Sequence, residues 1–392
     1  MKTKEIHARV ILDSRKEETI EVGTRTNFGT FSASAPYGKS TGKHEAPAFN
    51  KSIEDDIKTI TNISGKICEI EIGKFDDLKK VEEIASGIGA NSMIALETSI
   101  LKALAFEQGK ELWQVINPAA RRIPHPVGNI IEGGMHVQRS LKPDFQEFLV
   151  IPRTKKFVDD VFLMKKIHEN MGKILEARKA KQGLSDENAW ATSLGNEDVL
   201  QILDEERRNI EAETGEKIEI GVDAAASTFY SKQYIYKNPY KRLGNDEQIN
   251  YIASLVSRFN LFYVEDPLDE DDFSGFAKFK EKLTGKCLVV GDDLTTSNPE
   301  RLLKAIKNKS INAIIIKPNQ YGSLIKIKKL VDGCKKFGII TIMSHRSGET
   351  LDNALADLAF AFQTEFIKTG AAGKERDVKL KRLIEIEKSI SG

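Results

Sequence analysis

The pattern of hydrophobic and polar positions divides the chain into two parts, which predict different arrangements of strands and helices. In the first third, residues 6–12, 19–26 and 30–35 are short runs that contain β-branched residues, and a turn precedes the last of them. These runs predict an antiparallel meander. Between Met93 and Phe106 the apolar residues recur at helical spacing, which predicts a largely buried helix ending at Gly109. The first part is therefore expected to be α+β.

The later part alternates short apolar runs with helix-like sequence. Residues 121–126 hold two prolines and no periodicity, so we place the domain boundary there, with one domain at 1–122 and a second at 123–392. The second length suits an α/β barrel of about 250 residues. Near-continuous apolar strands between helices indicate a parallel sheet buried on both faces. The runs are 145–151, 218–222, 261–264, 288–291, 313–316, 339–343 and 366–367.

Six of these runs end in an ionisable residue. In chain order the six are Asp223, Glu265, Asp292, Lys317, His345 and Lys368. Subtraction of their numbers gives spacings of 42, 27, 25, 28 and 23 residues, of which four match one strand–helix unit and the longest leaves room for an additional element. One such residue usually marks only where a chain reaches the surface. Because the carboxyl ends of barrel strands meet on one face, six in this order predict a shared pocket.

The three carboxylates come first and define the expected chemistry. Converging carboxylates repel one another unless a cation lies between them, and hard oxygen ligands suit Mg²⁺, so Asp223, Glu265 and Asp292 are the predicted metal ligands. Positive charge from Lys368 and the metal is expected to lower the pKa of Lys317, which could then accept a proton. A base that faces a metal-held carboxylate can remove the proton α to it, while the metal stabilises the enediolate.

Two further motifs lie outside this set. Arg346 and Ser347 offer a forked cation and a hydroxyl at a strand end, which favours a phosphate contact; a surface salt bridge of Arg346 is the alternative. Residues 38–41 look like the end of a phosphate-binding P-loop. The full motif needs glycine five residues before Gly38, where the chain has Ala33, so nucleotide binding is not expected.

Composition excludes several classes of function. Lys and Arg number 59 and Asp and Glu 58, which argues against a broad basic surface for nucleic acid. The three cysteines lie far apart without a CxxC pair, so neither disulfides nor a zinc site is expected. No signal peptide is visible and no stretch approaches the ~18 apolar residues of a membrane span. We therefore expect a cytoplasmic protein without nucleic-acid or membrane partners.

Nine stretches of the chain resemble the enolase (phosphopyruvate hydratase) family, over nearly its whole length, and the last four are highly specific in combination. They are Ala8-Arg9-Val10-Ile11-Leu12-Asp13-Ser14-Arg15, Ser40-Thr41-Gly42, Gln146-Glu147-Phe148, Asp223-Ala224-Ala225-Ala226-Ser227, Val264-Glu265-Asp266-Pro267, Gly291-Asp292-Asp293-Leu294-Thr295, Lys317-Pro318-Asn319-Gln320, Ser344-His345-Arg346-Ser347-Gly348-Glu349-Thr350 and Ile367-Lys368-Thr369-Gly370.

The resemblance implies both fold and activity. The expected fold is an enolase-type β/α barrel with a smaller N-terminal α+β capping domain. The expected reaction is the Mg²⁺-dependent reversible dehydration of 2-phosphoglycerate to phosphoenolpyruvate, with two Mg²⁺ ions per site, the second arriving with the substrate. Enolase-superfamily sites are themselves the standard example of a Lys or His base beside one or two Mg²⁺ ions. A homo-oligomer, dimer or larger, is also implied.

The resemblance also implies a role for each matching residue. It assigns the first magnesium to Asp223, Glu265 and Asp292, and the second to Ser40. It assigns proton removal from C2 to Lys317, departure of the C3 hydroxyl to the acid Glu187 with Glu147 in support, and pocket positions to His136 and His345. It assigns substrate binding to Gln146, Arg346, Ser347 and Lys368, with Arg346 and Ser347 at the phosphate and Lys368 at the carboxylate.

The departures from the family lie in loops rather than at strand ends. They include Tyr37, Lys39, Met135, Asn188 and Ala189. The last two replace glycines, which limits loops that need positive φ, and loop closure completes sites of this type. Two alternatives therefore stay open: an enolase-like lyase for a different hydroxy acid, and a non-catalytic binding or scaffold protein of the enolase fold. Retention of Lys317 and Glu187 argues against the second.

Overall fold

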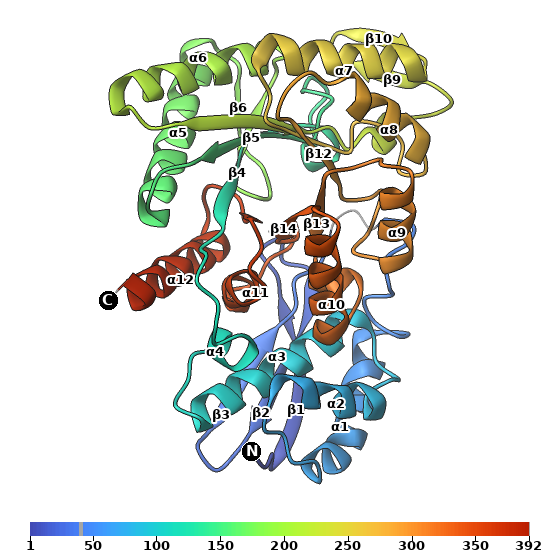
Figure 1. Cartoon of the computed structure of the whole chain (residues 1–392), viewed down its shortest axis with the longest axis vertical. Helices are drawn as coiled ribbons and strands as arrows, with labels where there is room; N and C mark the ends of the chain where they lie inside the picture. The colour runs from blue at the N-terminus through green and yellow to red at the C-terminus, as the bar shows by residue number, and fades with distance from the viewer. Residues whose placement is uncertain (39–41, 392) are drawn as a thin grey trace.

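The computed structural model describes residues 1–38 and 42–391, and it consists of a small N-terminal unit at one end of the long axis and a barrel at the other (Figure 1). The N-terminal sheet has the order β1-β2-β3 with antiparallel neighbours, as the meander prediction requires. Its strands are β1 Glu5–Leu12, β2 Glu18–Arg25 and β3 Thr30–Ser34. The helices beside it are α1 Ile53–Cys68, α2 Leu78–Ile84, α3 Ala90–Glu107 and α4 Leu112–Ile116. Helix α3 is the predicted buried helix.

The second unit is a closed barrel in which β15 pairs with β4 and completes the ring. Around the ring the strands are β4 His125–Glu132, β5 Glu147–Pro152, β8 Ile218–Asp223, β11 Tyr263–Glu265, β12 Leu288–Gly291, β13 Ala313–Ile316, β14 Ile340–Ser344 and β15 Phe366–Lys368. All seven predicted runs form strands. Strand β4 was not predicted, because Pro124 and Pro126 at its start read as a break in structure.

The expectation of an entirely parallel sheet is wrong for one strand. Strand β5 is antiparallel to both of its neighbours, β4 and β8, because it follows β4 through residues 133–146 without a crossover helix. An apolar run carries no sign of its direction, so the sequence pattern could not reveal this. The consequence is functional: Glu147 stands at the first residue of β5, opposite Asp223 at the last residue of β8.

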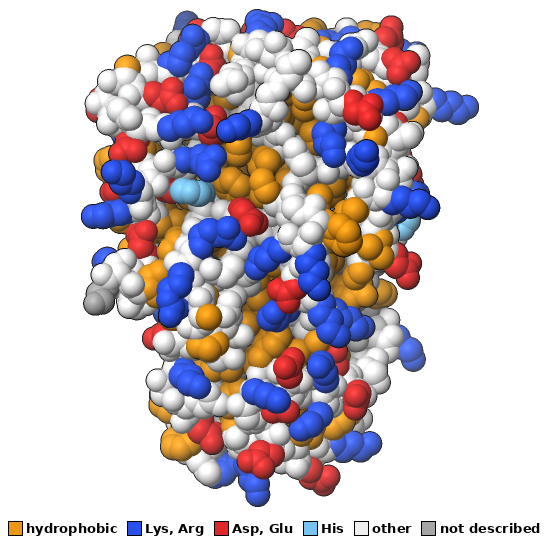
Figure 2. All heavy atoms as spheres, in the orientation of Figure 1, with side chains coloured by type: hydrophobic (Ala, Val, Ile, Leu, Met, Phe, Trp, Pro, Cys, Tyr) orange, Lys and Arg blue, Asp and Glu red, His pale blue; other side chains and the backbone are white. Residues whose placement is uncertain are grey.

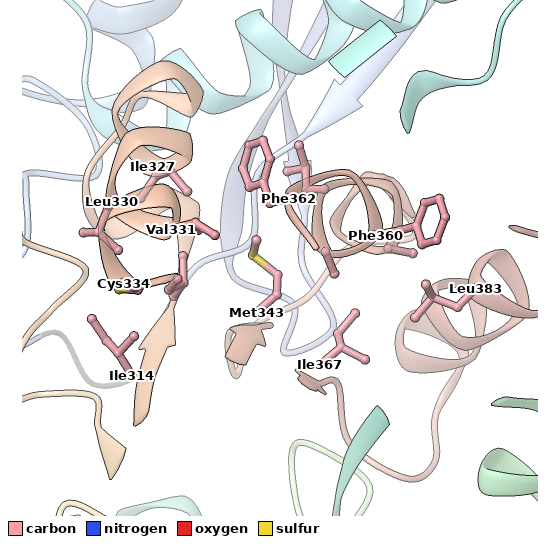
Figure 3. Close-up of a cluster of buried hydrophobic side chains, with 14 of the residues drawn as sticks. Ile314, Ile327, Leu330, Val331, Cys334, Met343, Phe360, Phe362, Ile367 and Leu383 are labelled. Atoms are coloured by element: carbon pink, nitrogen blue, oxygen red, sulfur yellow. The ribbon is translucent and has the colours of Figure 1, made fainter. Parts of the chain in front are cut away.

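Side chains of the strands alternate between two hydrophobic clusters. Ala313 and Ile315 point into the barrel interior with residues such as Tyr263, whereas Ile314 and Ile316 join the cluster shared with the surrounding helices. Figure 3 shows this second cluster, in which strand residues meet helical residues such as Val331, Phe360 and Leu383. The helices are α5 Phe157–Ala177, α6 Asn196–Thr214, α7 Asn245–Phe259, α8 Phe273–Lys282, α9 Pro299–Lys307, α10 Leu324–Lys336, α11 Ala354–Phe362 and α12 Lys374–Ser391.

Smaller elements fill the remaining sequence. The long spacing between Asp223 and Glu265 contains the hairpin of β9 Tyr234–Lys237 and β10 Tyr240–Leu243, besides α7. The others are β6 Lys181–Leu184 and β7 Trp190–Thr192, which extend the sheet beside β4, and short 3₁₀ turns at Phe75–Asp77, Gly134–His136, Ala226–Phe229 and Pro318–Gln320. Among the residues described, no helix is both long and apolar enough to traverse a bilayer.

Hydrogen bonds that involve backbone groups join the N-terminal unit to the barrel. Tyr37 and Gly348 exchange both backbone hydrogen bonds, at 2.8 and 2.9 Å. The carboxylate of Glu97 in α3 accepts from the backbone N–H of Leu324 at the start of α10. The small unit is thereby held against the carboxyl ends of the barrel strands. The boundary between residues 122 and 123 stays a prediction.

Candidate active site

The predicted site residues gather at the carboxyl ends of the barrel strands. Asp223, Glu265 and Lys368 end their strands, while Asp292 and Lys317 follow theirs directly. Alternation explains the inward direction: four of the five lie two residues after a member of the interior cluster, as Lys317 does after Ile315. Asp223 lies two residues after Gly221, which pairs with Tyr263 of that cluster. One cavity here is lined by His136, Gln146, Glu147, Glu187, Asp223, Asp292, Lys317, His345, Arg346, Ser347 and Lys368, all of them predicted, and also by Gly38, Ala225, Asp266, Asp293 and Ser344.

Two predicted residues are not among those lining the cavity. Glu265 is fully buried beneath it, where its carboxylate accepts a hydrogen bond from the Tyr263 hydroxyl and pairs with Lys368. Burial and the neighbouring Asp223 raise the pKa of Glu265 well above its usual range. Ser40, like the altered loop residue Lys39, lies outside the described residues.

Lys368 is the central cation of the site. Its ammonium lies 2.7 Å from Glu147 Oε2, 2.9 Å from Glu265 Oε2 and 3.2 Å from Asp223 Oδ2. All four side chains are at most 5% exposed, so solvent screens these interactions little. Burial alone would lower the pKa of Lys368, but the carboxylates outweigh it and raise that pKa well above its usual value.

Lys317 differs from the expectation in its electrostatics. Its ammonium pairs with the Asp292 carboxylate. Burial, Arg346 and Lys368 act to lower the pKa of Lys317, but the charge of Asp292 outweighs them and the pKa is raised. In the protein chain by itself the nearest charged group is the carboxylate of Asp292, so the direction is upward; the lowering expected from Lys368 together with the metal stays a prediction.

A second group of titratable side chains surrounds Glu187. Glu187 Oε1 lies 3.6 Å from His136 Nδ1, and Glu187 Oε2 lies 3.4 Å from His345 Nε2. His136 also contacts Glu132 at 3.3 Å. Burial first, and then the charge of Glu132, raise the pKa of Glu187, while burial raises the pKa of neighbouring Glu147 to about 8. Glu147 is therefore able to hold a proton near neutral pH, and the pKa of Glu187 is shifted in the same direction.

The two histidines differ in charge. Burial opposes protonation of His136, but the adjacent carboxylates of Glu132 and Glu187 outweigh it and raise its pKa to about 9. Burial, together with Arg376 and other cations, lowers the pKa of His345 well below its usual range. At neutral pH His136 is thus a cation and His345 a neutral ring, so only His136 stabilises negative charge on the carboxylates.

Arg346 forms an ion pair, though not one at the surface. Its two terminal nitrogens lie 2.9 and 3.2 Å from the two oxygens of Glu45, and the side chains are only 5% and 8% exposed. This fork holds the guanidinium plane at the rim of the cavity. Glu45 also accepts from the backbone N–H of Gly42, so it links the first loop of the chain to the site.

The donor chemistry fits a hard divalent cation. The carboxylates of Asp223, Glu265 and Asp292 are buried, and two lysines offset only part of their negative charge. The oxygens of Asp266, Asp292 and Asp293 also lie within 4.8 Å of one another. Burial and Asp292 raise the pKa of Asp293 to about 7. Oxygen donors with this surplus of negative charge are those that Mg²⁺ prefers.

Sequence reasoning missed four acidic residues beside the site: Glu45, Glu132, Asp266 and Asp293. Asp266 and Asp293 directly follow predicted ligands, and this adjacency was the available signal. Glu132 ends β4, the strand that was not predicted. Its buried position beside His136 could not be inferred without that strand.

A barrel with a rim of buried carboxylates and lysines, capped by a small α+β unit, defines a metal-dependent lyase that removes a proton next to a carboxylate. Family comparison agrees: residues 3–116 match the enolase N-terminal domain and residues 120–392 the enolase C-terminal TIM barrel domain. The chain belongs to the enolase family. Its lyase reaction, that of a phosphopyruvate hydratase, is the dehydration of 2-phosphoglycerate to phosphoenolpyruvate.

Individual relatives match the chain from end to end. It is 39% identical to an enolase of Methanocorpusculum labreanum, over 98% of both chains. It is 36% identical to an enolase of Thermoplasma acidophilum, over 99% of this chain and 98% of the relative. An enolase of Natronomonas pharaonis is 38% identical over 98% of both chains. Both the cap and the barrel are therefore shared with these relatives.

Proposed function

We propose that Lys317 removes the C2 proton of 2-phosphoglycerate and that Glu187 protonates the departing C3 hydroxyl. The observation that carries this assignment is that both residues line one buried cavity, with Lys317 against the carboxylate Asp292 and Glu187 between two histidines. A general acid must hold a proton before it acts, and burial and Glu132 raise the pKa of Glu187, which favours its protonated form. Glu147, the first residue of β5, supports it.

The raised pKa of Lys317 is compatible with a base under one condition. When the charge of Asp292 is engaged by Mg²⁺, burial, Arg346 and Lys368 still lower the pKa of Lys317, and among the groups named for it only Asp293 still raises it. Metal binding and activation of the base are then linked through a single carboxylate. Mg²⁺, when bound, supplies stabilisation of the negative charge that develops on the substrate carboxylate.

The remaining predicted residues are proposed to bind the substrate and the metal. Arg346 and Ser347 contact the phosphate, Gln146 and Lys368 the carboxylate end, and His136 and His345 orient Glu187. Asp223, Glu265 and Asp292 hold the first Mg²⁺; Ser40 completes a second site when substrate is present. We further propose a domain boundary after residue 122, a homo-oligomer of two or more chains, and a cytoplasmic location.

The altered loop residues give little support to a different substrate. Tyr37, Met135, Asn188 and Ala189 are absent from the cavity lining. Met135 is 57% exposed, and Tyr37 pairs with Gly348. Asn188 adopts φ +63°, a left-handed conformation that asparagine tolerates, so the loss of glycine there does not prevent the turn.

A direct assay tests this function. Phosphoenolpyruvate formation from 2-phosphoglycerate is measured with Mg²⁺ and with a chelator, and unphosphorylated hydroxy acids are offered in parallel. We expect turnover of 2-phosphoglycerate only, and only with metal. Absence of turnover, or a preference for an unphosphorylated acid, would contradict the proposal. Magnesium-independent partner binding without catalysis would favour the scaffold alternative.

A further inference from the structure

A second cavity lies at the opposite end of the barrel, where the strands begin. Its volume is about 500 Å³, within the usual range for small-molecule sites. Phe262 precedes β11, Leu288 begins β12, Ile340 begins β14 and Phe366 begins β15, and all four line the cavity. None of its lining residues belongs to the catalytic cavity.

The floor of this cavity is apolar and aromatic. Phe366 and Leu288 belong to the hydrophobic cluster inside the barrel, and Phe262 and Ile340 pack against that cluster while staying partly exposed. The ring centroids of Phe262 and Phe366 are 6.0 Å apart, with planes tilted by 56°. Figure 2 shows hydrophobic side chains exposed in the middle of the upper half of the molecule, with Lys and Arg side chains around them.

The rim of the cavity carries an excess of positive charge. Arg122 is paired with Glu365 at 2.9 Å. Arg153 and Lys286 also line the cavity, and within residues 1–38 and 42–391 neither side chain forms an ion pair. Arg153 instead lies over the Phe262 ring, with its guanidinium carbon 5.4 Å from the ring centroid. One carboxylate therefore faces three cations, and two of those cations are available to a ligand.

The other polar groups of the cavity are already satisfied. The side chain of Asn312 accepts from the Val289 backbone N–H at 2.7 Å and donates to the Cys287 carbonyl at 3.0 Å. His125 lies 2.9 Å from Asp160. A ligand would therefore obtain its orientation from the two cations at the rim and its burial from the aromatic floor.

We propose that this cavity, called the strand-start pocket, binds a small planar aromatic anion. The flat part lies on Phe262 and Phe366, and the anionic group meets Arg153 and Lys286. Arg153 stacked on Phe262 presents a preformed edge that matches a carboxylate, sulfonate or phosphate. The site is separate from catalysis. Lys286 precedes β12, and Arg153 follows β5, the antiparallel strand that ends where the other barrel strands begin.

Fluorescence titration with 8-anilinonaphthalene-1-sulfonate tests the proposal on the full chain. We expect one saturable site whose Kd rises roughly tenfold or more in Arg153→Glu, because an attractive charge becomes a repulsive one. Arg178→Glu reverses an exposed charge outside the pocket and should leave Kd unchanged. N-phenyl-1-naphthylamine has the same rings without the sulfonate and should bind more weakly and respond little to Arg153→Glu.

Three further readings keep the test decisive. Saturating Mg²⁺ and 2-phosphoglycerate should not displace the probe, and Arg153→Glu should retain wild-type turnover, which also shows that the variant is folded. Equal Kd values for wild type and Arg153→Glu, or displacement of the probe by substrate, would overturn the proposal. If Lys286→Gln also loses the preference for 8-anilinonaphthalene-1-sulfonate over N-phenyl-1-naphthylamine, that result would support the proposal.

Discussion

Replacement of Lys368 by Met removes the cation on which three buried carboxylates depend. The side chain keeps its length but loses the ammonium that lies within 3.2 Å of Glu147, Glu265 and Asp223. Removing one partner of a buried ion pair costs roughly 3–5 kcal/mol, because it leaves charge uncompensated. The variant is therefore expected to be strongly destabilised when no metal is bound.

This cost is measurable as a fall in melting temperature. At roughly 2–4 °C per kcal/mol, the melting temperature should fall on the order of 10 °C.

Thermal unfolding followed by circular dichroism measures this effect in EDTA and in Mg²⁺. The loss should shrink in Mg²⁺, because the ion restores positive charge among the same carboxylates. Lys173→Met is a matched control: its ammonium is also 2.7 Å from a carboxylate, on Glu169, but both side chains are at least 67% exposed, so the cost should stay below ~1 kcal/mol. Equal melting temperatures for Lys368→Met and wild type in EDTA would refute the reasoning.

Three other outcomes are expected. Burial raises the pKa of Glu97, so the folded chain keeps a proton that the unfolded chain releases above about pH 4.5, and stability falls as pH rises by up to ~1.4 kcal/mol per unit. Glu97→Gln keeps an acceptor for the Leu324 amide, and its stability should rise relative to wild type as the pH increases above about 4.5. A stability difference that is independent of pH would contradict this. Gly348→Ala would place Cβ 2.6 Å from the Tyr37 carbonyl oxygen and should lower the melting temperature by the equivalent of ~1–3 kcal/mol, whereas Gly65→Ala, with open space around it, should not. Chelation should abolish turnover reversibly, and activity that survives exhaustive chelation would argue against a required metal.

The sequence predicted the strand ends well because two physical signals coincided there. Buried strands read as apolar runs, and an ionisable residue after such a run is easily seen, as with Asp292 and Lys317. The same rule failed for β4, whose prolines look like a linker although Pro126 pairs with Ile367 in the ring. The antiparallel direction of β5 was also missed, because an apolar run does not indicate whether its strand is parallel or antiparallel to its neighbours.

The electrostatics of the site could not be predicted from the sequence for a different reason. The pKa of a buried group depends on which neighbour is nearest, and that requires coordinates. The sequence places Lys317 and Lys368 in one pocket, and from this alone a lowered pKa for Lys317 follows. The structure instead places Asp292 against Lys317, which reverses the direction until that carboxylate is engaged by metal.

Proton exchange at C2 tests the central claim, that Lys317 is the base. 2-Phosphoglycerate is incubated in D₂O with Mg²⁺ and the loss of the C2 proton signal is followed by NMR. We expect wild type and Glu187→Gln to exchange this proton, the latter with little phosphoenolpyruvate formed, while Lys317→Ala exchanges it roughly 10²–10⁴-fold more slowly. Exchange at the wild-type rate by Lys317→Ala would contradict the account.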